Sequence, residues 1–141
     1  MIPRHQPTYG LLDLAMSALP GGFGATIAQV EQRIADRVGV PFGVLFPSVR
    51  AGLATTLRIL GEHTGQARNV LVPAYVCGVV HEAVHRAGWV PDFVDVSELG
   101  FLAAYDDEKV EGRVVVASEM FGHQLGSPLG TARYRIYDWA M

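Results

Sequence analysis

Lysine and cysteine are almost absent from this sequence of 141 residues, in which Lys109 and Cys77 are the single examples of each. A lone cysteine cannot close a disulfide within the chain, and this favours a cytoplasmic protein. Charged residues make up 18% of the sequence, and the 11 basic ones are scattered, so the clustered positive face of a nucleic-acid-binding protein is not expected. No apolar run reaches the ~18 residues of a membrane-spanning helix. We therefore expect neither nucleic acid nor membrane as a partner.

Apolar residues are abundant, at 50% of the sequence, and predict a buried core. After residue 25, short apolar runs alternate with helical patterns. The runs predict strands at 42–46, 70–72, 90–94, 113–117 and 135–138. Helices are expected between them at 49–60, ending at Gly61, at 76–87 and at 106–110. Strands joined by helical crossovers predict an α/β fold, with a mostly parallel sheet and flanking helices.

The first residues differ in composition from the rest. Residues 1–24 are rich in proline and glycine and predict an irregular N-terminal arm with one short helix at 11–18. From Thr26 to Gly39, apolar residues recur every three or four positions, which predicts an amphipathic helix between these two residues. We expect two parts: the arm at 1–24 and a domain at 25–141.

The turn after the expected strand 42–46 is the first candidate site. Ser48, Val49 and Arg50 open a helix there, and free backbone N–H groups with the serine hydroxyl suit a phosphate. Arg50 opposes the helix dipole unless an anion lies beside it. The alternative is a structural role, in which Ser48 is an N-cap. The sequence leaves both open.

Asp138 is the second candidate, because it ends an apolar strand. In open α/β sheets the functional crevice lies at the carboxyl ends of the strands. A carboxylate at that position needs a partner. A cationic ligand, such as a protonated pyridine nitrogen, would provide one, and a structural helix N-cap is the alternative.

A third pattern, His81-Glu82-Ala83-Val84-His85, matches the HExxH motif of zinc metallopeptidases. Two histidines one turn apart can bind Zn²⁺, with the glutamate as general base. Pro91 stands where a third ligand would follow. In the alternative interpretation, these residues form the polar face of a crossover helix.

Four segments occur in register along residues 25–141. They are Ser-Val-Arg-Ala-Gly-Leu at 48–53, Val-Leu-Val-Pro-Ala-Tyr at 70–75, Ala-Gly-Trp-Val-Pro-Asp-Phe-Val-Asp-Val at 87–96, and Phe-Gly at 121–122 with Ile-Tyr-Asp-Trp-Ala at 136–140. Their order and spacing resemble the N-terminal part of the DegT/DnrJ/StrS-type sugar aminotransferases, which use pyridoxal 5′-phosphate. The resemblance implies an incomplete large domain of the fold type I transferases.

The resemblance also implies cofactor-binding residues: Ser48, Val49, Arg50, Tyr75, Cys77 and Asp138. The first three fall on the family's Ser-Gly-Thr phosphate grip, so an arginine stands where threonine is usual. Cys77 falls on the aromatic residue that stacks on the cofactor ring, and Tyr75 is its possible substitute. Asp138 falls on the aspartate that pairs with the pyridine nitrogen and keeps the ring cationic.

The family's Schiff-base lysine has no counterpart here. It lies beyond the aspartate, where this sequence has already ended, and Lys109 matches no part of that motif. We therefore expect a truncated family member, without a catalytic residue and inactive alone, that binds the cofactor weakly or not at all. The resemblance implies an amino donor and a keto-sugar nucleotide as substrates, and a homodimer. A non-catalytic remnant that acts by association is the alternative.

Overall fold

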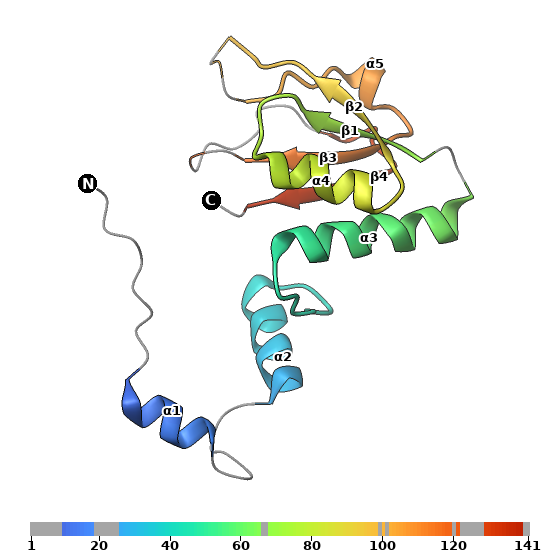
Figure 1. The fold of residues 1–141 in the computed structure, drawn as a ribbon. Coiled ribbons are helices and arrows are strands. Elements are labelled where there is room, and N and C mark those ends of the chain that lie inside the picture. Colours follow the sequence, from blue (N-terminus) through green and yellow to red (C-terminus); the bar gives the residue numbers. More distant parts are fainter. Residues whose placement is uncertain are drawn as a thin grey trace. The chain divides into compact units, whose positions relative to one another are not determined.

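A computed structural model describes residues 10–18, 26–65, 68–98, 100, 102–119, 121 and 129–139. The chain divides into two compact units, Met1–Leu45 and Phe46–Met141 (Figure 1). Much of the expected arm (1–9 and 19–24), the Gly122 and Ala140 positions of the family-like segments, and Met141 lie outside the described residues. None of the described helices is long and apolar enough to cross a membrane.

The first unit contains helices α1 (Leu11–Ser17) and α2 (Ile27–Val38). Helix α2 starts and ends as predicted. The Thr26 hydroxyl accepts the N–H of Gln29, while the Gln29 side chain accepts the N–H of Thr26, which forms a capping box. Gly39 ends the helix in the left-handed conformation (φ 76°) that glycine adopts readily.

The expected buried strand at 42–46 is wrong. No described segment pairs with these residues, and Phe42 and Val44 are 83% and 67% exposed. The Leu45 N–H instead donates to the Glu31 carboxylate of α2, at 2.8 Å. The apolar composition of residues 42–46 is typical of a buried strand, but a strand also needs a neighbour that completes its backbone hydrogen bonds.

The second unit contains a four-stranded parallel sheet of β1 (Asn69–Pro73), β2 (Val90–Val94), β3 (Val114–Ser118) and β4 (Tyr134–Asp138). The strand order is β2-β1-β3-β4. Each strand lies within one or two residues of its predicted position. The α/β class with a parallel sheet and flanking helices is therefore confirmed. Since all strands run the same way, their carboxyl ends share one edge (Figure 1).

Each face of the sheet packs on its own apolar core. Helices α3 (Val49–Thr64) and α4 (Gly78–Arg86) cover one face, and α5 (Asp107–Val110) with residues 102–105 covers the other (Figure 1). The first core contains Leu53, Leu57, Val70, Val72, Val80, Ala83, Val84, Ala87, Trp89, Val114 and Val116. The second contains Leu71, Val94, Ala103, Tyr105, Val110, Val115, Ala117, Leu129 and Ala132. The alternation along β1 and β3 shows that both faces of these central strands are buried.

Helix α3 does not end at Gly61, as the sequence suggested, but continues to Thr64 with Gly65 as its left-handed cap. Gly61 is buried, and a Cβ placed on it would lie 3.2 Å from both Arg68 Nε and Trp89 Nε1. This glycine therefore permits the Arg68 and Trp89 side chains to pack closely against the helix. Helix α4 is shorter than the expected 76–87, and Cys77 occupies its N-cap position.

Candidate functional site

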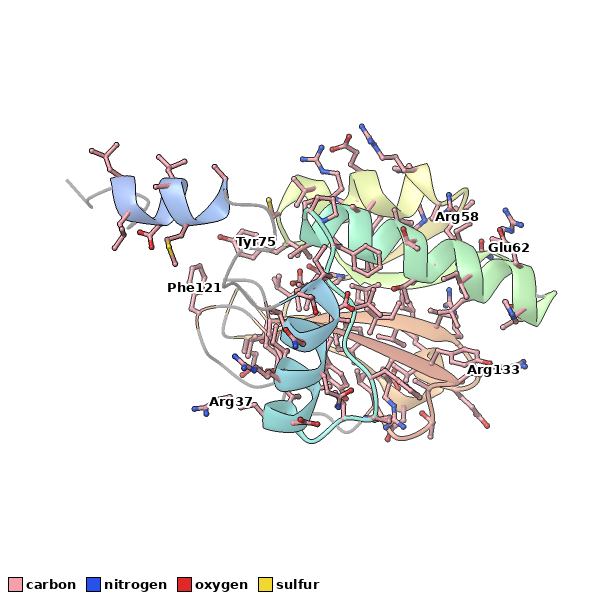
Figure 2. The ribbon with its side chains drawn as sticks, turned by 90° about the horizontal axis from the view of Figure 1, so that it is seen from below. Arg37, Arg58, Glu62, Tyr75, Phe121 and Arg133 are labelled. Carbon is pink, nitrogen blue, oxygen red and sulfur yellow. The ribbon has the colours of Figure 1, made fainter. Side chains whose placement is uncertain are left out.

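The predicted site residues gather at the carboxyl edge of the sheet. Tyr75 and Cys77 lie in the connection from β1 to α4, and Asp138 ends β4. Helix α3, which begins after Ser48, has its first turn at the same edge (Figure 1). Figure 2 shows Tyr75 and Phe121 at this end of the unit and Arg133, which precedes β4, at the other. The fold therefore places the candidates where parallel α/β sheets bind their ligands.

Ser48 caps helix α3. Its backbone is extended (φ −162°, ψ 157°), and its Oγ accepts the N–H of Ala51 at 3.2 Å. Ser48 is therefore an N-cap, which is the structural role considered as the alternative to phosphate binding. A serine hydroxyl that accepts one hydrogen bond still carries a proton to donate, so the cap leaves Ser48 able to bind a phosphate oxygen. The first turn of a helix also leaves its early N–H groups without intrahelical acceptors.

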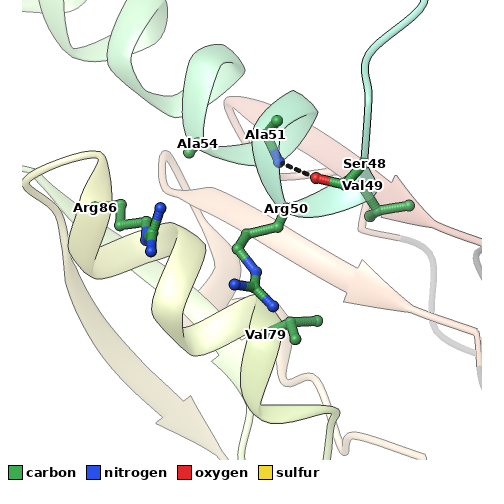
Figure 3. A pocket seen from close by; sticks show the side chains of 7 residues that line it. All are labelled: Ser48, Val49, Arg50, Ala51, Ala54, Val79 and Arg86. Atoms are coloured by element: carbon green, nitrogen blue, oxygen red, sulfur yellow. Dashed lines mark hydrogen bonds between the residues drawn. The ribbon is translucent and has the colours of Figure 1, made fainter.

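A pocket of about 430 Å³ lies between the first turns of α3 and helix α4 (Figure 3). It is lined by Ser48, Val49, Arg50, Ala51, Ala54, Val79 and Arg86. Tyr75, Cys77 and Asp138 do not line it. The structure therefore brings the three predicted phosphate-binding residues together and leaves the other three elsewhere along the same edge.

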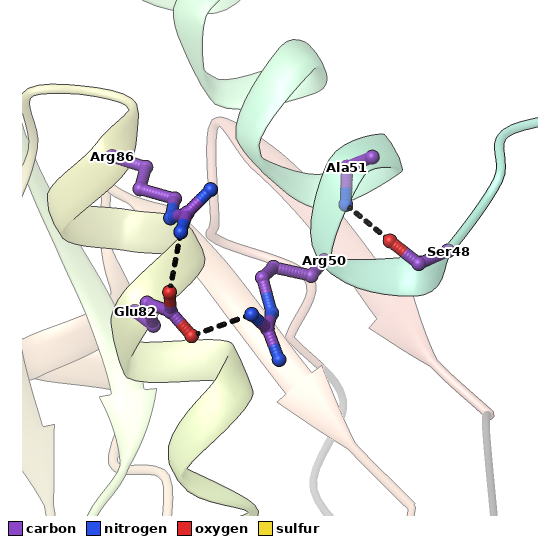
Figure 4. A network of polar contacts seen from close by, with 5 residues as sticks. All are labelled: Ser48, Arg50, Ala51, Glu82 and Arg86. Carbon is purple, nitrogen blue, oxygen red and sulfur yellow. Dashed lines mark hydrogen bonds and ion pairs between the residues drawn. The ribbon is translucent and has the colours of Figure 1, made fainter.

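The pocket's two arginines share one carboxylate. Arg50 Nη1 lies 2.9 Å from Glu82 Oε2, and Arg86 Nη2 lies 2.8 Å from Glu82 Oε1 (Figure 4). In the sequence, Glu82 stands out only as part of the HExxH pattern, and Arg86 belongs to none of the predicted sites. The spacing of Glu82 and Arg86, four residues apart on one helix, was a readable signal. The pair with Arg50 joins two helices, and no local pattern reveals it.

The zinc interpretation finds no support. His81 Nε2 lies 3.1 Å from the carbonyl oxygen of Pro73, and the His81 ring meets Phe93 edge-on with centroids 5.1 Å apart. His85 is exposed, and Glu82 is held by arginines. Among the described residues, no three His, Cys, Asp or Glu side chains are grouped to hold a metal ion. The motif residues serve the packing and the polar face of α4.

The remaining predicted residues differ in exposure. Tyr75 is 51% exposed, and the Cys77 thiol is free and exposed. Asp138 is half-buried, and across the β3–β4 ladder its register partner is Ser118. Ser118 is only 3% exposed, and its hydroxyl has no hydrogen-bond partner among the described residues. Ser118 was not predicted as a site residue, because only the strand register places it beside Asp138.

Comparison with known families places most of the chain within one family model. The model of the DegT/DnrJ/EryC1/StrS aminotransferase family matches residues 15–122, well over half of the chain. The matched range contains the pocket and the β1–α4 connection, and Asp138 follows it. No curated protein and no solved structure matches the chain.

Proposed function

The chain belongs to the DegT/DnrJ/EryC1/StrS aminotransferase family, and from this premise we propose that it provides the phosphate- and ring-binding part of an aminotransferase that acts on a keto-sugar nucleotide. The family depends on pyridoxal phosphate. We assign residues 25–141 to part of the cofactor-binding large domain and residues 1–24 to an arm. The other substrate would be an amino donor, and the assembly a homodimer.

The observation that carries this proposal is the pocket at the start of α3. A phosphate monoester is anionic, and here it would meet early helix N–H groups, the Ser48 hydroxyl and the Arg50 guanidinium. Further along the edge, the Ser118 hydroxyl beside Asp138 has no hydrogen-bond partner among the described residues, and it is a buried polar group that a bound ring could satisfy. The residues present therefore fit pyridoxal phosphate.

The residues have distinct roles in this proposal. Ser48, Val49 and Arg50 would hold the phosphate, and Tyr75 or Cys77 would lie against the ring. The Asp138 carboxylate would accept a hydrogen bond from the protonated pyridine nitrogen and so keep that proton on the ring. When bound, the cofactor supplies the electron sink for amino-group transfer.

Lys109 does not belong to this site. It lies on α5, the helix whose Val110 packs in the core on the opposite face of the sheet from α3 and α4. It is also exposed, next to the acidic residues that open the helix. We propose that Lys109 does not take the role of the family's Schiff-base lysine and that the 141 residues alone do not transfer amino groups. Borohydride treatment with pyridoxal phosphate should then leave no specific adduct on Lys109.

Pyridoxamine 5′-phosphate tests the site directly, because its binding needs no lysine. We expect the chain to bind it weakly, and Ser48→Ala to weaken binding further by about 1.5–3 kcal/mol, the usual cost of a hydrogen bond to a charged group. Isothermal titration calorimetry measures both affinities. Thr26→Ala is the matched control, since it removes the N-cap of α2 and leaves the pocket intact. Equal affinities of wild type and Ser48→Ala would contradict the assignment.

A further inference from the structure

Glu82 lies between the two arginines of the pocket and binds both of them (Figure 4). Building on the proposed function, we propose that Glu82 is the resident counter-ion of the pocket. Its carboxylate holds Arg50 until a phosphate ester binds, and the phosphate then takes over the Arg50 guanidinium. Glu82 is thereby a specificity-determining residue, although it does not line the pocket.

The geometry of the three side chains permits this exchange. Glu82 uses one oxygen for each arginine, Oε2 for Arg50 and Oε1 for Arg86. A guanidinium carries five N–H donors, so each arginine keeps donors that the carboxylate does not use. A phosphate can therefore approach Arg50 before Glu82 has left it.

Arg50 needs an anion in either state. It is the second residue of α3, and a cation in the first turn opposes the positive end of the helix dipole. The Glu82 carboxylate, which lies on the neighbouring helix α4, offsets this repulsion between Arg50 and the dipole of α3. A phosphate would relieve it more fully, because it also accepts the early N–H groups of α3. The two anions therefore compete for one guanidinium.

Exposure makes the exchange inexpensive. The Arg50 and Glu82 side chains are 39% and 41% exposed, and ion pairs at such positions are weak. Arg86 is 64% exposed and lies one turn from Glu82 on the same helix. When phosphate binds Arg50, Glu82 keeps Arg86 as its partner. Arg50, Glu82 and Arg86 therefore each have a charged partner both with and without bound phosphate.

The competition predicts which ligands the pocket accepts. A monoanionic carboxylate has no advantage over Glu82, whereas a dianionic phosphate ester has twice its charge. The rest of the pocket lining, Val49, Ala51, Ala54 and Val79, is apolar, so Ser48, Arg50 and Arg86 are its polar groups. The ligand class is therefore a phosphate monoester.

The test is a titration of pyridoxamine 5′-phosphate into wild type, Glu82→Gln, Arg50→Gln and the double variant. We expect Glu82→Gln to bind about five- to tenfold more tightly, because it removes both a competing ion pair and repulsion of the phosphate. Arg50→Gln should bind about tenfold more weakly. In the double variant the gain from Glu82→Gln should vanish, since the two residues act on each other. Pyridoxamine without its phosphate should show no gain.

Matched controls make the same charge changes elsewhere. Glu62 and Arg58 lie on the later turns of α3 and do not line the pocket, so Glu62→Gln and Arg58→Gln should leave the affinity unchanged (Figure 2). Circular dichroism and thermal melting check that each variant folds. If wild type binds but Glu82→Gln binds with the same affinity, the proposed role of Glu82 is wrong and the proposed function stands. The same holds if Glu62→Gln tightens binding as much as Glu82→Gln does. Absence of binding in every variant would overturn the proposed function and the role of Glu82 with it.

Discussion

Tyr105 is a buried phenol, 8% exposed, whose hydroxyl donates to the Val116 carbonyl oxygen of β3 at 2.7 Å. Burial raises the pKa of Tyr105 above its ordinary value of 10.0, because the protein interior disfavours the phenolate. In the unfolded chain this phenol ionises near its ordinary pKa, while the folded protein keeps it neutral. The stabilisation is therefore complete below that pH and is lost as the pH rises above it. We expect the free energy of unfolding to fall by up to about 1.4 kcal/mol per pH unit there.

Urea unfolding at pH 8, 10 and 11 measures this loss. Tyr105→Phe should be less stable at pH 8, by about 0.5–1.5 kcal/mol, since it lacks the hydrogen bond to Val116. It should also lose less stability than wild type between pH 8 and 11. Tyr137→Phe is the control, because Tyr137 is 45% exposed. If wild type and Tyr105→Phe show the same pH dependence, Tyr105 is not the source of the alkaline instability.

At the scale of elements, the sequence predicts a helix end at Gly61, but helix α3 continues through this residue, and a glycine is needed there for close packing. An alanine in a helix interior usually gains about 1 kcal/mol over glycine. Here its Cβ would press on Trp89, whose indole N–H donates to the Leu57 carbonyl oxygen at 2.8 Å and is therefore held in place. We expect Gly61→Ala to destabilise the chain by about 1–3 kcal/mol, as overpacking does. Gly78→Ala, with nothing within 4 Å of the added Cβ, is the control. An unchanged or raised melting temperature for Gly61→Ala would contradict this.

Local signals predicted the elements that local interactions determine. Thr26 and Gly39 mark the two ends of α2 through contacts within a few residues, and the sequence reveals both ends. The buried strand expected at 42–46 is absent because no described segment pairs with these residues, and pairing is not a local property of the sequence. The site follows the same division. The Ser48 turn was visible in the sequence, whereas the Glu82 bridge depends on how two helices pack.

At the scale of the whole molecule, the described residues leave much apolar surface uncovered. In the first unit, side chains more than 60% exposed include Leu11, Leu12, Leu14, Ile27, Phe42 and Val44. In the second, β2 and β4 are the edges of the sheet, and edge strands can pair with another chain. Monomeric proteins rarely expose large apolar patches. The exposed apolar side chains of the first unit and the edge strands of the sheet both favour self-association. Substitutions in the first unit and on an edge strand can distinguish between them.

We expect the 141-residue chain to self-associate through the apolar residues of the first unit, because their side chains are the most exposed. Sedimentation velocity over a range of concentrations should show species larger than a monomer. Phe42→Ser with Val44→Ser should shift the distribution toward monomer, since it removes two large apolar side chains that are 83% and 67% exposed. Val90→Thr, on the edge strand β2, should leave it unchanged. The reverse pattern would assign association to the sheet edge, and a monomer at all concentrations would show that this apolar surface does not drive association.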